Sequence, residues 1–170
     1  MRILPTERAV EWIHAWTELD WPITWETAYA TRDKLGWKPE PEDPELFTTE
    51  LTANQDGGYI TRYQNAVGDI SIPLTSFNTS ETKDHTWINN VWRAYDLYAK
   101  RLTNLYGNGK QTGSRMDILQ TDWITPKGVT VSLIGSAEGI EADLDSPEIT
   151  AIDQLESYYI DKYGENYVDD

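Results

Sequence analysis

The sequence GIEADLDSPE, residues 139–148, changes from a strand pattern to a helix pattern within one short stretch. Its first part alternates apolar residues with acids: Ile140, Ala142 and Leu144 in one set, and Glu141, Asp143 and Asp145 in the other. Because successive side chains of a strand point to opposite faces, the apolar set is predicted to face the core and the acids to face outward, about 7 Å apart along the strand. Ser146 and Pro147 then supply the N-cap and the first-turn proline of a helix.

The rest of the chain divides into helical and extended segments. Apolar residues recur three or four positions apart in residues 6–19, 24–36 and 88–105, and again after residue 147, which predicts four helices. Alternating patterns predict strands between residues 46 and 74, with a hairpin turn at Asp56-Gly57, and at 116–124, 129–134 and 140–145. Such segregated strands predict an α+β fold, with about four helices packed on antiparallel sheets in the order α-α-β-β-β-α-β-β-β-α. A single globular domain of residues 1–170 accommodates them.

The charge is unevenly distributed. Of the formal net charge of −15, residues 39–56 contribute −6 because they hold six acids and neither Lys nor Arg. Residues 138–170 contribute −10, from eleven acids against Lys162, so the remainder is +1. A concentrated acidic field repels itself and attracts basic partners, so we expect a basic protein as partner.

The same charge disfavours direct contact with nucleic acid and with anionic membranes, since both are polyanionic. No apolar run of the sequence approaches the roughly 20 residues that a bilayer requires, and residues 1–7 contain no apolar signal-peptide region. We therefore expect a cytoplasmic protein without membrane contact, either a monomer or a homodimer. The absence of cysteine removes disulfides, thiolate nucleophiles and Cys-based zinc sites.

One helix face resembles a metal site only in part. Glu7, Glu11, His14 and Glu18 share that face of the first predicted helix, and Glu11-x-x-His14 matches the ligand pair of carboxylate di-iron proteins. Such a site needs a second Glu-x-x-His, which His85 does not complete. An ordinary amphipathic surface explains the spacing, so we assign no metal, no cofactor and no catalytic residue.

The strongest candidate site is the acidic C-terminal third. We predict that it binds a partner through Glu141, Asp143 and Asp145 on the strand and through Glu148, Asp153 and Glu156 on the helix that follows. Trp21 is the candidate apolar anchor, because it flanks Pro22 at the end of the first predicted helix. A solvated surface is the competing interpretation of the acids, but such a surface usually mixes both signs of charge.

Several short segments carry a resemblance to known proteins. They are Leu19-Asp20-Trp21-Pro22, Trp123 with Pro126-x-Gly128, and Ser146-Pro147. With them the chain resembles a family of uncharacterised small acidic bacterial proteins similar to the immunity proteins of polymorphic toxin systems. The resemblance implies a cytoplasmic inhibitor that covers the active surface of a cognate toxin.

Three functional hypotheses follow. The first is a non-enzymatic binding protein, an immunity protein that neutralises a toxin through its acidic face. The second is an export or folding chaperone of the small acidic α+β type, which predicts a homodimer with an extended apolar groove. The third is a carbohydrate-active enzyme with paired carboxylates in a cleft lined by some of the eight tryptophans.

Overall fold

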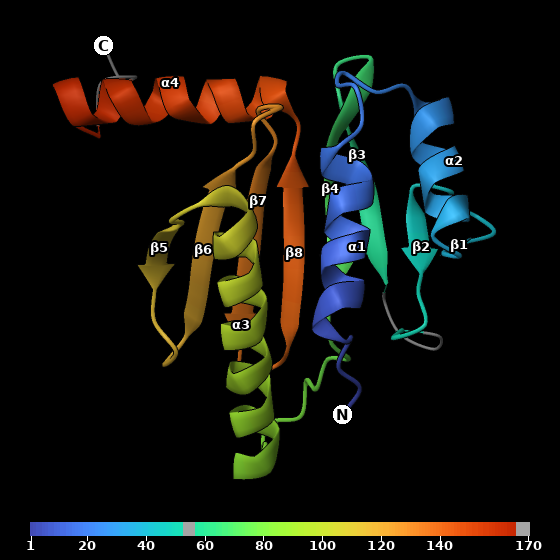
Figure 1. Ribbon diagram of the computed structural model, residues 1–170, viewed down its shortest axis with the longest axis vertical. Coiled ribbons are helices and arrows are strands. Elements are labelled where there is room, and N and C mark those ends of the chain that lie inside the picture. The colour runs from blue at the N-terminus through green and yellow to red at the C-terminus, as the bar shows by residue number, and fades with distance from the viewer. Residues whose placement is uncertain (53–56, 166–170) are drawn as a thin grey trace.

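Four helices and an antiparallel sheet make up the protein in a computed structural model, which describes residues 1–52 and 57–165 (Figure 1). The helices are α1 (Thr6–Thr17), α2 (Trp25–Lys34), α3 (His85–Tyr106) and α4 (Pro147–Tyr163). The strands are β1 (Lys38–Pro39), β2 (Leu46–Thr48), β3 (Gly58–Tyr63), β4 (Ala66–Pro73), β5 (Lys110–Gly113), β6 (Ile118–Ile124), β7 (Thr130–Ser136) and β8 (Ile140–Asp145). The predicted α+β fold class is confirmed.

The sheet consists of two antiparallel meanders joined in the middle. Within the described residues, the strand order is β1-β2-β3-β4-β8-β7-β6-β5, so the last strand of each meander pairs with the other. Each meander has four strands where the sequence predicts three, because β1 and β5 extend the two edges. β1 is two residues long and β5 is exposed throughout, so neither shows an alternation of buried and exposed residues.

The turn between β3 and β4 is formed by Gln64 and Asn65, since Tyr63 pairs with Ala66. Gln64 has a φ of 53°, the left-handed conformation that two-residue hairpin turns favour at this position. The predicted turn at Asp56-Gly57 falls in part on residue 56, which lies outside the described residues.

One face of the sheet is covered by α1 and α3 (Figure 1). The hydroxyls of Tyr95 on α3 and Thr121 on β6 are 2.8 Å apart and hydrogen-bonded, which fixes α3 against this face. The strand side chains beneath the two helices are completely buried, and they include Ile70, Ile72, Val131, Leu133, Ile140, Ala142 and Leu144. The apolar half of the alternation in residues 139–148 therefore forms the centre of the core.

An aromatic cluster ties α1 to the first meander. The Trp37 ring stacks on Phe47 with centroids 4.5 Å apart, and it lies 5.1 Å from Trp12 and 6.0 Å from Trp16. All four side chains are buried. Aromatic pairs at these separations contribute beyond their buried area, so this cluster holds one end of the core together.

The last helix extends away from the core. Its N-cap is Ser146, whose hydroxyl accepts a hydrogen bond from the Ile149 amide, and Thr150 is buried. Every described residue from 151 onward is exposed, and the helix crosses one end of the sheet and projects from it (Figure 1). No helix in residues 1–52 or 57–165 is long and apolar enough to span a bilayer.

The aromatic cluster leads to a stability prediction. Replacing Trp37 by Ala removes the ring that the other three contact, and we expect the free energy of unfolding to fall by about 3–5 kcal/mol. Urea denaturation measures this change. Leu97→Ala on the exposed side of α3 is the control and should shift the value by no more than about 0.5 kcal/mol. Equal effects of the two substitutions would contradict the prediction.

Candidate partner-binding face

The acidic half of the alternation in β8 lies on the sheet face opposite α1 and α3. Glu141, Asp143 and Asp145 alternate with the buried residues of that strand and are themselves half-buried. Asp69 on β4 and Asp122 on β6 have the same orientation, because their chain neighbours Ile70 and Trp123 are buried in the core. We call these five carboxylates, Asp69, Asp122, Glu141, Asp143 and Asp145, the acidic face.

The strand register brings these acids close to one another. Asp69 lies directly opposite Asp145 in the pairing of β4 with β8. Asp143 lies between Ser71 on β4 and Ser132 on β7, and Ser132 in turn lies opposite Asp122 on β6. Like charges directly opposite each other destabilise a sheet, so this arrangement opposes folding.

The pKa values of four of the acids reflect their burial first and, for three of them, this crowding. Burial, followed by the nearby charges of Asp69 and Asp153, raises the pKa of Asp145 to about 6. Burial and the charge of Asp143 raise the pKa of Glu141 to about 6. Burial also raises the pKa of Asp69 and that of Asp143. Ionising these groups therefore costs free energy that the folded protein must supply elsewhere.

Few hydrogen bonds offset this cost. The Thr61 hydroxyl donates to Asp69, and hydrogen bonding from Ser71 partly opposes the rise in the pKa of Asp143. The Asp143 Oδ1 atom is nevertheless buried without accepting a hydrogen bond from any described residue. A buried acceptor without a hydrogen bond is costly, so Asp143 adds to the free energy that the acidic face requires.

A groove deepens the acidic face at one end. It has a volume of about 610 Å³ and lies between the sheet and the underside of α4. Its carboxylates come from both walls: Asp122 and Asp145 from the sheet, and Asp153 and Asp161 from α4. Lys110 at the sheet edge is its basic residue, and no tryptophan of the described chain is among the residues that line it.

Two threonines hold α4 over this groove. The hydroxyls of Thr130 on β7 and Thr150 on α4 are 2.8 Å apart, and the Thr130 amide donates to the Thr150 hydroxyl at 3.2 Å. Ile149 packs close to Gly68 on β4, where an added Cβ would lie 3.2 Å from its Cδ1 atom. The groove therefore depends on contacts of the first turn of the helix.

The structure brings together only part of the predicted site. Glu141, Asp143 and Asp145 share the acidic face, and Asp153 joins Asp145 in the groove. Glu148 and Glu156 are exposed on α4 but do not line the groove. Asp69 and Asp122 were not predicted from the sequence. Each belongs to an alternating strand, but only the pairing register reveals that they lie beside β8.

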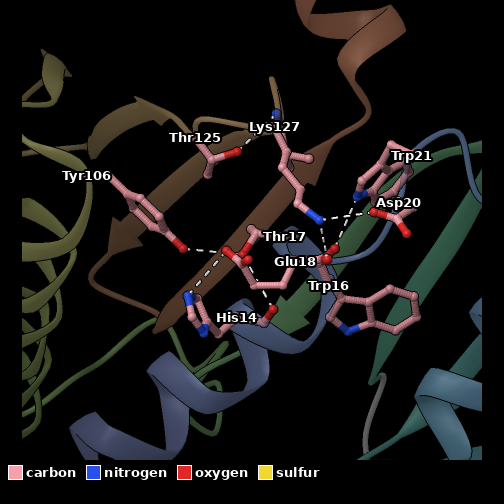
Figure 2. Close-up of polar contacts among 10 residues, drawn as sticks. His14, Trp16, Thr17, Glu18, Asp20, Trp21, Tyr106, Thr125 and Lys127 are labelled. Atoms are coloured by element: carbon pink, nitrogen blue, oxygen red, sulfur yellow. Dashed lines mark hydrogen bonds and ion pairs between the residues drawn. The ribbon is translucent and has the colours of Figure 1, made fainter.

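Trp21 is not part of the acidic face. It is half-buried and packs against the core, and its indole Nε1 donates a hydrogen bond to the Trp16 carbonyl at 3.1 Å (Figure 2). Beside it, the Lys127 ammonium donates to the Glu18 carbonyl at 2.7 Å and to the Asp20 carboxylate at 3.1 Å. These contacts fasten the end of α1 to the turn between β6 and β7.

The three segments that carried the resemblance meet at this turn. Lys127 joins the turn to Asp20, and Gly128 lies against Pro147 at the start of α4. Gly128 has a φ of +85°, the left-handed region that favours glycine, and it lies in van der Waals range of Pro147. The three segments therefore have a structural role, because they join α1, the second meander and α4.

The helix face with the partial metal motif is engaged in surface ion pairs. Glu7 contacts Arg101 at 3.0 Å, and Glu11 contacts Arg8 at 2.9 Å. His14 lies 3.4 Å from Glu18 (Figure 2). Within the ranges that the structure describes, no group of three or more His, Cys, Asp or Glu side chains is arranged to hold a metal ion.

The fold and the face together define an α+β protein with an open, acidic sheet surface. Residues 7–146 match a family of unknown function, DUF6301, and the chain belongs to this family. The match ends at Ser146, the N-cap of α4, so α4 lies beyond the matched region. Neither the curated proteins nor the solved structures give a significant match.

The acidic face predicts an unusual dependence of stability on pH. The pKa of Asp145 rises from 3.8 to about 6 on folding, so the folded state binds this proton more tightly than the unfolded state. Its contribution is therefore most favourable below pH 3.8 and is lost as the pH rises through about 6. We expect Asp145→Asn to raise the free energy of unfolding near neutral pH by about 1–2 kcal/mol, after allowance for solvent screening.

Urea denaturation at a neutral pH and at a pH below 3.8 measures the effect of Asp145→Asn. At the acidic pH the substitution should change stability by less than about 0.5 kcal/mol, because wild-type Asp145 is then protonated. Asp117→Asn, at an exposed turn residue, is the matched control. A gain of equal size at both pH values would contradict the assignment of the raised pKa to Asp145.

Proposed function

We propose that this protein is a non-enzymatic cytoplasmic binding protein that neutralises a basic partner, a cognate toxin, as an immunity protein does. The observation that supports this proposal is the acidic face. Five carboxylates lie on one sheet surface around the pairing of β4 with β8, and the adjoining groove adds Asp153 and Asp161. Basic side chains of a partner would supply positive charge to balance these carboxylates.

The energetic cost of the acidic face supports a binding role. Burial raises the pKa values of four of its acids, and repulsion by neighbouring acids adds to the rise in Asp69, Glu141 and Asp145, which a purely structural surface has no need to tolerate. A basic partner would reverse the sign of this effect, because Lys or Arg beside the carboxylates favours their charged form. Binding would thus relieve a strain that the free protein carries.

Acidic charge also gives a kinetic advantage to an inhibitor. Complementary charge speeds the diffusional encounter of two proteins, and it does so less as salt screens the interaction. A toxin that acts on nucleic acid needs a basic substrate surface, so an acidic inhibitor would compete for that surface directly. The inhibitor would thus bind the basic substrate surface of the toxin and block access of nucleic acid to it.

The raised pKa of Asp145 favours one competing function. A carboxyl with a pKa near 6 beside the second carboxyl of Asp69 is the kind of pair that acid–base hydrolysis of a glycosidic bond requires. An enzyme of this kind would lose nearly all turnover on a single Asp145→Asn substitution. Inhibition by charge would instead weaken in steps as successive acids are neutralised.

The decisive experiment compares two triple variants that remove the same charge. Asp69→Asn/Asp122→Asn/Asp145→Asn neutralises the acidic face, whereas Glu26→Gln/Glu42→Gln/Glu81→Gln neutralises three exposed acids elsewhere. Proteins captured from the host by the wild type are identified by mass, and the affinity of each purified partner is measured by calorimetry. Measurements at about 0.05 M and about 0.5 M NaCl report the electrostatic contribution.

The proposal expects one basic partner whose affinity falls by about tenfold or more in the acidic-face variant but not in the control variant. It also expects that the wild type and the control variant, but not the acidic-face variant, suppress the toxicity of that partner in growing cells. Equal binding by the two variants would overturn the role of the acidic face. Turnover of a sugar substrate that Asp145→Asn abolishes would favour the enzyme instead.

A further inference from the structure

The outer side of α4 carries an apolar stripe that remains partly exposed. Ile152, Leu155, Tyr159 and Tyr163 recur three or four residues apart, so they share one side of the helix. Their exposed fractions are 36%, 55%, 36% and 59%. A stripe of large apolar side chains at this spacing is normally buried against another element, so its exposure indicates an interaction site.

The orientation of α4 follows from its other side. The residues that face the groove are mostly polar, namely Thr150, Asp153, Gln154, Ser157, Tyr158 and Asp161. The helix therefore turns a largely polar side toward its own sheet and its apolar stripe away from it. Because contacts with the sheet are concentrated in the first turn, later residues contribute little to the fold.

The spacing of the stripe suits a second helix. Apolar residues separated by three, four and four positions form the narrow seam along which two helices pack side by side. From Ile152 to Tyr163 the seam is about 16 Å long, which a partner helix of about three turns would cover.

The charges beside the seam indicate the chemistry of that partner. Glu148 and Glu156 are the acids of α4 that do not line the groove, against Lys162, whereas Asp153 and Asp161 face the groove. The Lys162 ammonium lies 4.9 Å from the centroid of Tyr163 and 5.6 Å from that of Tyr158, so the rings of α4 itself engage it. Two copies of this chain, each with a net charge of −15, would repel each other, whereas a helix flanked by Lys and Arg would be attracted.

We propose that the outer stripe of α4 binds a basic amphipathic helix of another protein, with the apolar seams packed together and the flanking charges paired. This contact is separate from the acidic face, because the stripe lies on the opposite side of α4 from the groove. It also lies outside residues 7–146, the region matched by the DUF6301 family. It does not depend on the proposed inhibition of a toxin.

A designed peptide tests this proposal without knowledge of the natural partner. The probe is a Leu/Lys peptide of about 15 residues patterned as an amphipathic helix, which is about the shortest length at which isolated helices persist. Its controls are a scrambled peptide of equal composition and a Leu/Glu peptide of equal pattern. Fluorescence anisotropy of each labelled peptide gives its affinity for the full-length protein.

Matched variants locate the binding surface. Ile152→Gln/Leu155→Gln removes half of the stripe at exposed positions, and Leu97→Gln/Leu105→Gln makes the same change on the exposed side of α3. We expect the stripe variant to bind the patterned Leu/Lys peptide about tenfold more weakly or worse, and the α3 variant to bind like the wild type. Circular dichroism verifies that both variants are folded.

Several outcomes would overturn the proposal. One is equal affinity of the stripe variant and the wild type, and another is equal affinity for the scrambled peptide, which would indicate attraction by charge alone. A third is a wild-type dimer in sedimentation equilibrium that the stripe variant dissociates, since a second copy would then occupy the stripe. The triple variant of the acidic face separates the two proposals, because it should retain the seam-dependent binding of the patterned peptide.

Discussion

The antiparallel pairing of β4 with β8 is the constraint on which the rest of the structure depends. It joins two meanders that are otherwise built from neighbouring strands, and α1 packs on β8 while α3 packs on the adjoining β7 and β6. On one side of this pairing, Ile70, Ile72, Ala142 and Leu144 are fully buried. On the other side it aligns Asp69 with Asp145, so the same register produces both the core and the acidic face.

Stability and surface charge therefore conflict at the centre of the molecule. The free energy gained by burying the apolar side of β8 holds the strand in register. The same register fixes the carboxylates of its other side in their half-buried positions. Their raised pKa values measure the conflict, and the buried Asp143 oxygen shows that hydrogen bonds do not resolve it. Uncharged Ser or Thr at these positions would avoid this cost, and Ser71 and Ser132 beside Asp143 are examples of such residues on the same face.

Local patterns predicted the parts of the fold that depend on neighbouring residues. The four helices and the in–out alternation of β8 are local, and the spacing of apolar residues predicts them. The edge strands β1 and β5 were missed because they bury too little to impose a period. Asp69 and Asp122 were missed because their proximity to β8 is a property of long-range pairing. Trp21 was chosen as an anchor from its position beside Pro22, and that position alone does not show that its indole donates to the Trp16 carbonyl.

The two edge strands of the sheet, β1 and β5, have features that disfavour edge-to-edge association between molecules. An unpaired edge strand offers backbone groups to any other edge, and a wide sheet has two such edges. Here β1 is two residues long and consists of Lys38 and Pro39, and proline has no backbone N–H to offer a neighbour. At the other edge β5 carries Lys110 and ends at Gly113, whose φ of +77° bends the strand, while α4 overhangs the groove that Lys110 lines. The protein can thus leave a broad face open to other molecules and still be protected from edge-to-edge aggregation.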